Sequence, residues 1–531
     1  MSDTSAIDFV ASEEKSKSAW GAASAGASAT GLLLGLAALK IALQFAGIRH
    51  YGFFRDELYY MACGEHLAWG YVDQPPLIAL VAWLARHLFG HSIVGLRIFP
   101  VLAGAAVVFL TGIFAGELGG GRLAQSLAAI SLLFAPAFLA FDSFFSMNAF
   151  EPFFWLLCAW LVIRIVKGAS PKWWLTFGLV AGVGLENKHT MLVFGFALAA
   201  GLLLAGEWRI FRSKWIWMGA CVAMLVFLPN VVWEARHGWP QVEVVRNAQL
   251  YKNIPVTPLG FLAEQIVFLN PIVFPLWLGG LVWYFRSPEA KRFRFLGWNY
   301  LIVLAIFMIC GGKAYYALPV YPILFAAGGV VLEHFAEGRK RRRIVFGYAA
   351  IIATAGLVAL PFGVPVLPVN TFLRYSRVLP YSSLAKTERD ALRAPLPQLY
   401  ADMFGWKNMA ETVAQVYDGL PASDRANCAI LGGNYGETGA IDYYGPALGL
   451  PKAIGGHNSY FYWGPRGYSG ACVIVFGEQS RKFMQLFGDV RQAATIESPH
   501  AMPNEQSVPV YVCRKPRAPL AVLWPRFKMI I

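Results

Sequence analysis

Long apolar runs separated by short polar loops fill the first two-thirds of the chain. A helix that crosses a bilayer needs about 20 predominantly apolar residues, and by this measure the sequence predicts about 11 transmembrane helices. They are expected near residues 28–48, 93–117, 122–141, 147–166, 173–186, 189–206, 215–234, 260–285, 295–311, 317–334 and 343–362. The fifth and sixth are short and could be partly re-entrant. The apolar stretch 75–90 is too short to span and contains Arg86 and His87, so we expect a helix lying in the membrane interface.

The pattern changes after residue 362, where polar residues return and apolar positions begin to alternate. Residues 398–418 predict an amphipathic helix that ends at Gly419 and Pro421. The remaining predicted elements are short strands at 427–431, 471–476 and 507–513, and helical stretches near 436–447 and 479–487. This mixture predicts a small α/β domain.

The chain is therefore expected to divide into three parts. They are a cytoplasmic tail at 1–27, a transmembrane domain at 28–362 and a C-terminal α/β domain at 363–531. The fold class is that of a polytopic α-helical membrane protein with a small extracytoplasmic domain.

Composition supports a membrane protein. Hydrophobic residues make up 57% of the 531 residues, and charged residues only 14%, whereas soluble domains carry about 25% charged residues. An ordinary soluble enzyme and a disordered chain are thereby excluded. No Walker A motif is present, which argues against ATP hydrolysis.

The placement of lysine and arginine sets the orientation. One alternating set of loops carries most of them, including the run Arg339–Arg343, and such loops remain cytoplasmic. The net charge of +14 follows from this bias and does not indicate a nucleic-acid partner. An odd number of spans then puts the C-terminal domain on the outer side. Cys428, Cys472 and Cys513 lie there, so one disulfide can form with one thiol left over.

Unusual polar residues gather in the loops on the outer side. The first outer loop contains Arg55, Asp56 and Glu57 in succession, and Asp73 follows. Ionisable groups at a membrane edge are costly and are functional candidates. The alternative is an interfacial clasp, in which Arg55 pairs with one of the two neighbouring carboxylates.

A second outer loop contains Asp142, Asn148 and Glu151. The last two are three residues apart and share one helix face. Helix capping is the alternative for this group. A third outer site contains Lys188, which could bind a phosphate or instead pair with Glu186 as a snorkelling lysine.

A fourth outer site combines Lys313 with Tyr315 and Tyr316. Charge, hydroxyl groups and aromatic rings could hold a phosphate and a sugar together, although an aromatic interface belt is the alternative. Taken together, the outer loops suit transfer of a group from a lipid phosphate. A carboxylate would serve as general base, and cations would neutralise the departing phosphate.

These motifs resemble those of the GT-C superfamily of membrane glycosyltransferases. The resemblance is closest to bacterial family 39, which is related to protein O-mannosyltransferases and to the lipid A aminoarabinose transferase. It covers most of residues 30–335 and rests on Phe54-Arg-Asp-Glu57 with Tyr59, Asp73-Gln-Pro-Pro76, Asp142 to Glu151, Lys188, and Lys313 to Pro319.

The resemblance implies an inverting transferase of the cytoplasmic (inner) membrane that uses a polyprenyl-phosphate-linked sugar. The implied catalytic residues are Asp56 as the general base, its neighbour Glu57, and Asp142. The implied donor-phosphate residues are Arg55, Lys188, Lys313, Tyr315 and Tyr316, and the residues for the acceptor, for orientation or for a metal are Glu151, Asn148 and Asp73. The acceptor would be lipid A or lipopolysaccharide, another envelope glycan or a protein. No cofactor is implied beyond a divalent cation, whose use stays open, as do the sugar and the oligomeric state.

The alternative function is a transporter or flippase of a lipid-linked sugar. Carriers tend to place charges near the bilayer midplane and to show paired repeats. Here the charges lie at one face and the sequence shows no repeat, which favours the enzyme.

Overall fold

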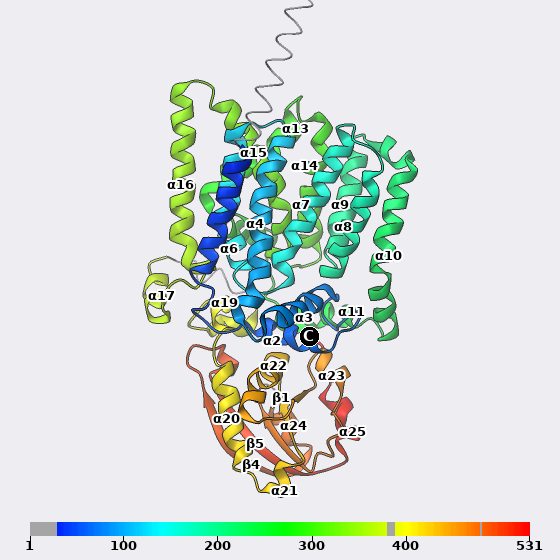
Figure 1. Ribbon diagram of the computed structural model, residues 1–531, viewed down its shortest axis with the longest axis vertical. Coiled ribbons are helices and arrows are strands. Elements are labelled where there is room, and N and C mark those ends of the chain that lie inside the picture. Colours follow the sequence, from blue (N-terminus) through cyan, green and yellow to red (C-terminus); the bar gives the residue numbers. More distant parts are fainter. Residues whose placement is uncertain (1–28, 380–387, 478–479) are drawn as a thin grey trace, which may run out of the picture.

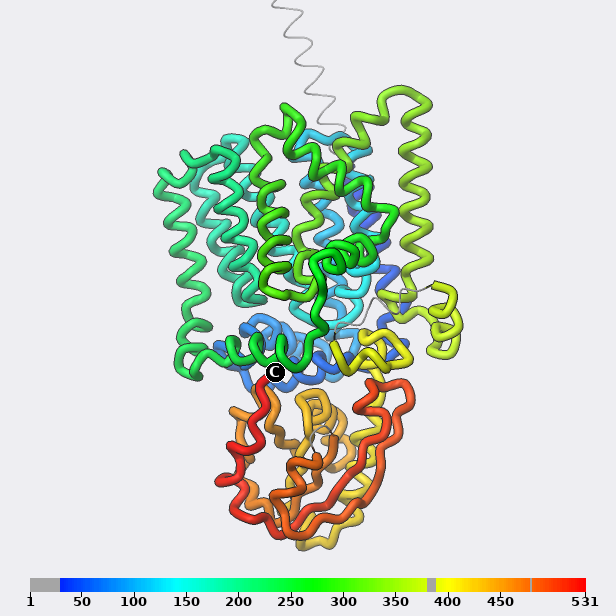
Figure 2. Tube along the Cα trace, turned by 180° about the vertical axis from the view of Figure 1, so that it is seen from behind, coloured from blue at the N-terminus to red at the C-terminus, as the bar shows by residue number. Residues whose placement is uncertain are grey.

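The structure, a computed structural model, describes residues 29–379, 388–477 and 480–531. A bundle of long helices forms one part of the molecule, and a smaller part containing a β-sheet lies beyond one end of that bundle (Figure 1). Short helices occupy the layer between the two parts, as the view from behind also shows (Figure 2). The protein is thus a mostly helical membrane protein with a small C-terminal sheet.

The bundle contains a helix in every predicted span. Its helices are Ala29–Phe45, α4 (Ile93–Glu117), α5 (Arg122–Leu133), α6 (Pro136–Phe141), α7 (Met147–Val166), α8 (Trp173–Asn187), α9 (Met191–Leu204), α10 (Lys214–Arg236), α12 (Pro258–Phe268), α13 (Phe274–Arg286), α14 (Arg294–Ile309), α15 (Tyr321–Phe335) and α16 (Arg339–Gly363). Within the described residues, six helical segments are long and apolar enough to cross a membrane alone. The pair α12–α13, bent by 98°, would be a seventh. The number of eleven spans therefore stays a prediction.

Breaks inside the predicted spans have local causes. The span 122–141 divides into α5 and α6, and Pro136 is the first residue of α6. Proline lacks an amide hydrogen and fits the first turn of a helix but not its interior. The span 260–285 is likewise interrupted before Pro271, between α12 and α13.

The layer between the two parts is formed mainly by outer-loop helices. These are α2 (Arg55–Glu65), α3 (Leu77–Phe89) and α11 (Pro240–Asn247), which lie across the end of the bundle (Figure 1). The helix predicted over 75–90 is present as α3. The layer thus carries the first outer loop, where the candidate residues begin.

The C-terminal part contains one five-stranded sheet. Its strands are β1 (Cys428–Gly432), β2 (Ile454–Gly455), β3 (Cys472–Phe476), β4 (Phe487–Glu497) and β5 (Ser507–Pro516). Their order is β2-β1-β3-β5-β4. The β1 strand pairs in parallel with β2 and β3, whereas β5 pairs antiparallel with β3 and β4. The predicted strands at 427–431, 471–476 and 507–513 are confirmed as β1, β3 and β5.

The helices of this part agree less closely with the sequence pattern. Its helices are α17 (Val369–Ser376), α19 (Gln398–Ala401), α20 (Trp406–Asp418), α21 (Ala422–Arg425), α22 (Tyr435–Tyr444), α23 (Ser459–Trp463), α24 (Ser480–Met484) and α25 (Leu520–Leu523). The single helix predicted over 398–418 is broken, because Gly405 adopts a φ of 96°, which glycine tolerates without a steric penalty. The helical stretch predicted near 479–487 extends too far, since β4 already begins at Phe487.

A shared hydrophobic core joins the C-terminal part to the outer helices. Leu58 and Ile78 belong to the same buried cluster as Ile441 and Ile474. Helix α22 can approach α2 closely because a side chain at Gly439 would contact the backbone of Leu58. The C-terminal part is therefore packed against the membrane part through a continuous apolar interface.

A disulfide crosses the parallel pair β1 and β3. Cys428 and Cys472 lie opposite each other and are bonded, while Cys513 is a free, buried thiol. We predict that the double substitution Cys428→Ser and Cys472→Ser lowers the free energy of unfolding by about 2–5 kcal/mol. Thermal unfolding with and without reductant measures this. Reductant should not change the melting temperature of the double variant. A wild type whose melting temperature is equally insensitive to reductant would contradict the prediction.

Candidate active site

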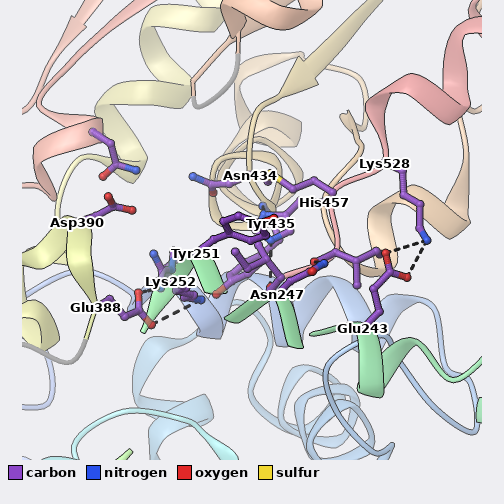
Figure 3. A pocket seen from close by; sticks show the side chains of 15 residues that line it. Glu243, Asn247, Tyr251, Lys252, Glu388, Asp390, Asn434, Tyr435, His457 and Lys528 are labelled. Atoms are coloured by element: carbon purple, nitrogen blue, oxygen red, sulfur yellow. Dashed lines mark hydrogen bonds and ion pairs between the residues drawn. The ribbon is translucent and has the colours of Figure 1, made fainter. Parts of the chain in front are cut away.

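A pocket of about 460 Å³ lies where the outer layer meets the C-terminal part. Its lining comes from seven separate stretches of chain. The residues that matter for its chemistry are Arg55, Lys252, Glu388, Tyr435 and His457. Figure 3 shows Lys252 and Glu388 on one side of this pocket, with Tyr435 and His457 close by.

Arg55 begins α2 and occupies the centre of an ionic cluster. Its side chain is 12% exposed, and its guanidinium lies 3.3 Å from a Glu388 oxygen and 3.5 Å from an Asp402 oxygen. Its Nε is 3.7 Å from Asp56, and its guanidinium carbon lies 5.6 Å from the centre of the Tyr435 ring. The backbone amide of Arg55 also donates to the carbonyl of Asp402. The predicted clasp with a neighbouring carboxylate is thus only one part of a wider network.

Asp56 is the accessible carboxylate of the first outer loop. Its side chain is 28% exposed, and Oδ1 accepts a hydrogen bond of 2.8 Å from the Tyr435 hydroxyl. Asp56 therefore adjoins the pocket through Arg55 and Tyr435, which both line it. A partly exposed carboxylate held by one hydroxyl can accept a proton from a bound alcohol.

Glu57 lies in a different environment, although it is the next residue. Its side chain is fully buried, and its two oxygens accept bonds of 2.8 and 2.7 Å from the Arg97 guanidinium. The same carboxylate accepts from the amides of Phe54 and Phe145. These four bonds tie α2 to α4 and to the loop before α7, so Glu57 fixes the position of its neighbour Asp56.

Asp142 is also engaged in an ion pair. It lies 2.7 Å from Lys40, and both side chains are almost completely buried. The bundle leaves room for the carboxylate at Gly104, where an added Cβ would overlap Asp142 Oδ2. Lys40 additionally donates to the carbonyl of Phe138. All of these partners of Asp142 lie within the helical bundle.

Lys188 brings the second and third outer sites together. It donates to Asn148 Oδ1 at 2.7 Å and to Glu151 Oε2 at 2.8 Å, and Glu151 also accepts from the Thr190 hydroxyl. The Lys188 ammonium lies 4.7 Å from the centre of the Tyr316 ring. Lys188 thus pairs with Glu151, not with Glu186 as the snorkelling alternative proposed.

Two tyrosines connect this group to Lys313. The Tyr315 and Tyr316 rings meet edge to face with centres 4.8 Å apart, and Lys313 lies 5.9 Å from the Tyr315 ring. The Lys313 ammonium is 3.1 Å from Glu388. The predicted donor residues therefore form one continuous array from Lys188 to Arg55.

Asp73 reaches the same region through Tyr59. The Tyr59 hydroxyl lies 2.8 Å from Asp73 Oδ1 and 2.7 Å from Ser459 Oγ. Burial raises the pKa of Asp73 to about 6, even though the bond from Tyr59 acts in the opposite direction. Tyr59 thus connects Asp73 of the first outer loop to Ser459 of the C-terminal part.

Five residues of the site were not predicted from the sequence. They are Lys252, Glu388, Asp402, Tyr435 and His457, and the last four follow the membrane spans. Tyr435 carried a weak signal, since Asn434 and Glu437 around it form a helix capping box. Glu388 carried no local signal, because its importance comes from partners far away in the sequence.

The acidic residues considered for a metal have partners in the protein. Glu151 is paired with Lys188, and Asp73 accepts from the Tyr59 hydroxyl. Asp142, which was expected to be catalytic, is paired with Lys40. In the part of the chain that the structure describes, no group of three or more His, Cys, Asp and Glu side chains could hold a metal ion. A divalent ion at Asp142 or Glu151 would have to displace a lysine.

Comparisons with known proteins agree with this picture. Residues 73–233 match the family model for dolichyl-phosphate-mannose-protein mannosyltransferase. A lipid A galacturonosyltransferase, RgtD of Rhizobium johnstonii, is 24% identical over 250 residues, which are 46% of this chain and 52% of the relative. A polyprenol-phosphate-mannose–protein mannosyltransferase of Corynebacterium glutamicum is 26% identical over 171 residues, 28% of this chain and 32% of the relative. The chain thus spans about half, or less, of the length of these curated relatives.

The fold as a whole has solved counterparts. ArnT from Cupriavidus metallidurans bound to undecaprenyl phosphate superimposes with a TM-score of 0.61 at 16% identity, covering 91% of this chain and 98% of ArnT. The apo form of ArnT gives a TM-score of 0.60 at 15% identity, with the same coverage. The chain has the fold of these membrane proteins. With the sequence matches, this fold confirms the resemblance to family 39 of the GT-C glycosyltransferases.

The buried pair of Glu57 and Arg97 yields a stability prediction. We expect Glu57→Gln to lower the free energy of unfolding by about 3–5 kcal/mol, because it leaves Arg97 buried without its counter-charge. Thermal unfolding in detergent measures this, with Glu411→Gln on the exposed face of α20 as a control. A Glu57→Gln protein as stable as the control would contradict the positioning role.

Asp402 yields a prediction about pH. Burial raises the pKa of Asp402 from 3.8 to about 7, while Arg55 acts against this rise. The folded protein therefore keeps a proton that the unfolded chain releases at lower pH, so Asp402 makes stability fall as the pH rises from about 4 to 7. We expect Asp402→Asn to reduce the loss of thermal stability between pH 5 and pH 8. If Asp402→Asn loses as much thermal stability between pH 5 and pH 8 as the wild type does, Asp402 does not titrate in this range.

Proposed function

We propose that the protein is a membrane glycosyltransferase that moves a sugar from a polyprenyl-phosphate-linked donor to an acceptor at the outer face of the cytoplasmic membrane. One observation carries this proposal. The partly exposed carboxylate of Asp56 adjoins a cluster of cations, Arg55, Lys252 and Lys313, that is suited to bind an anion. The two curated relatives, one a lipid A galacturonosyltransferase and one a polyprenol-phosphate-mannose–protein mannosyltransferase, support it.

Asp56 acts as the general base in this mechanism. It accepts the proton of the acceptor hydroxyl while the hydroxyl oxygen attacks the anomeric carbon of the sugar. The bond between that carbon and the phosphate oxygen breaks, and the electron pair stays on the phosphate. Attack from the face opposite the leaving phosphate inverts the anomeric configuration.

The cations stabilise the charge that develops on the departing phosphate. Arg55 contacts Asp56 directly, and Lys313 belongs to the same network through Glu388. Fixed charges in a partly dry site are worth more than in water. We assign Lys188 to the donor as well, since Tyr316 and Tyr315 connect it to Lys313. Asn148 and Glu151 hold Lys188 in place, and the two tyrosines offer rings and hydroxyls to the sugar.

Glu57, Asp142 and Asp73 are assigned to positioning. Glu57 and Asp142 are each saturated by a buried cation, and Asp73 accepts from Tyr59. Tyr435 positions the base most directly, because its hydroxyl donates a hydrogen bond to Asp56 itself. The C-terminal part would thus complete the active site.

The proposal includes the finer features of the topology. We infer eleven spans, a transmembrane domain at 28–362 and an outer domain at 363–531. We also infer a cytoplasmic tail at 1–27, which lies outside the residues that the structure describes. The enzyme would reside in the inner membrane with its site on the periplasmic side, and would use lipid A or lipopolysaccharide, another envelope glycan or a protein as acceptor. The matches to transferases favour transfer of a sugar over its transport without chemistry.

The substitution Asp56→Asn tests the proposal. It preserves the shape of the side chain but removes its basicity, so transfer should fall by about 10²–10⁴-fold while thermal stability is kept. The measurement is mass spectrometry of envelope lipids and glycans from cells that lack the gene and are complemented with each variant. One sugar should disappear without the gene and return with the wild type and with Glu411→Gln, but not with Asp56→Asn.

Two outcomes would contradict the proposal. Full restoration by Asp56→Asn would refute the role of the base. Unchanged glycans, together with a lipid-linked sugar that changes leaflet, would identify a transporter instead.

A further inference from the structure

One carboxylate, that of Glu388, pairs with three cations. It lies 3.1 Å from Lys313, 3.3 Å from Arg55 and 3.5 Å from Lys252. The Glu388 side chain is 10% exposed, and the three cations are 12–22% exposed. Figure 3 shows the contact between Lys252 and Glu388 at the edge of the pocket. The Glu388 carboxylate therefore already occupies the position between the three cations.

The backbone explains how Glu388 reaches this place. Glu388 forms an antiparallel bridge with Asn253, the residue after Lys252, and the Arg389 side chain donates to the carbonyl of Asn253 at 3.2 Å. Two segments far apart in sequence thus meet and deliver one anion and one cation together. Arg55 comes from α2 and Lys313 from the loop after α14.

The cluster contains three cations and three carboxylates, and Glu388 is the carboxylate that all three cations share. Three positive groups contact Glu388, and the other carboxylates within ion-pair distance, Asp56 and Asp402, contact only Arg55 among them. Burial would raise the pKa of Glu388, but the charges of Lys252, Lys313 and Arg55 outweigh it and hold this pKa well below its usual range. Glu388 is therefore ionised at neutral pH and occupies the site as a competing anion.

We propose that Glu388 occupies, in the donor-free protein, the position that the donor phosphate takes during catalysis, and that the two anions exchange on the same three cations. This inference rests on the proposed function and extends it. It adds Lys252 to the phosphate site and identifies an internal competitor. A phosphodiester carries one negative charge, so the exchange conserves the charge of the cluster.

The exchange has a consequence for product release. When the sugar leaves, its bond to the phosphate oxygen breaks and the polyprenyl phosphate becomes a monoester with a charge of about −1.5 to −2 at pH 7. Three cations alone would bind this product more tightly than the donor. Glu388 opposes this by returning to the cations, which makes the product easier to release.

Binding of undecaprenyl phosphate to the full-length protein in detergent tests the exchange. The proteins are the wild type, Glu388→Gln and the exposed control Glu411→Gln, and undecaprenol serves as the neutral probe. Removing a competing charge from a close ionic cluster should tighten binding of undecaprenyl phosphate by about tenfold or more. Binding of undecaprenol should be the same for all three proteins. In turnover, Glu388→Gln should show a lower KM for the donor and stronger inhibition by undecaprenyl phosphate.

The outcomes separate the two proposals. If the wild type does not prefer undecaprenyl phosphate over undecaprenol, the proposed function fails. If the wild type has this preference but Glu388→Gln binds the phosphate no more tightly, only the exchange fails. Should Glu388→Gln not fold, Glu388→Asp replaces it, because its shorter side chain keeps the charge but reaches less far. Glu388→Asp should then bind undecaprenyl phosphate more tightly than the wild type, and equal or weaker binding would overturn the exchange.

Discussion

The buried guanidinium of Arg55 is the contact on which the arrangement of this site depends. A buried cation is stable only if carboxylates compensate it, and Arg55 has three, Asp56, Glu388 and Asp402. Each comes from a different part of the structure: the first outer loop, the segment after α17 and the end of α19. One side chain therefore couples the position of the proposed base to the packing of the C-terminal part. The α22 helix reinforces this coupling, because a Cβ at Gly436 would overlap the Arg55 side chain.

Pairing of buried cations with carboxylates also determines the arrangement of the other lysines near the outer face. Each lysine near the site has an oxygen partner: Lys40 has Asp142, Lys188 has Glu151 and Lys313 has Glu388. In a region of low dielectric such pairing is required for stability. The pairs differ in where they lie, however. The first is enclosed in the bundle, whereas Glu388 lines an open pocket, so the Glu388 cluster is placed to exchange its anion for one from outside.

Much of the fold could be predicted from the sequence, because apolar runs and alternation report directly on burial. The helices of the bundle and strands β1, β3 and β5 were found in this way. Strand β4 was not, because it is an edge strand with Asp489, Arg491 and Gln492 along a largely exposed stretch. Such a strand is defined by its pairing with β5 and shows no apolar alternation.

The site could be predicted only in part. The outer loops and their charged residues were found, and the family resemblance assigned the base to Asp56. The different environments of Asp56 and Glu57 could not be predicted, because they arise from successive residues on a helix pointing in different directions. Glu388 depends on partners that are distant in the chain. Lys40 did carry a usable signal, since a lysine inside an apolar span requires a partner in the protein.

The most direct measurement is an experimental structure of the protein with undecaprenyl phosphate bound. The phosphate should lie within hydrogen-bonding distance of Arg55, Lys252 and Lys313, next to Asp56, with the Glu388 carboxylate displaced from these cations. A phosphate bound elsewhere, for example among the arginines at the start of α16, with the Glu388 cluster intact, would contradict the assignment of the outer-face site.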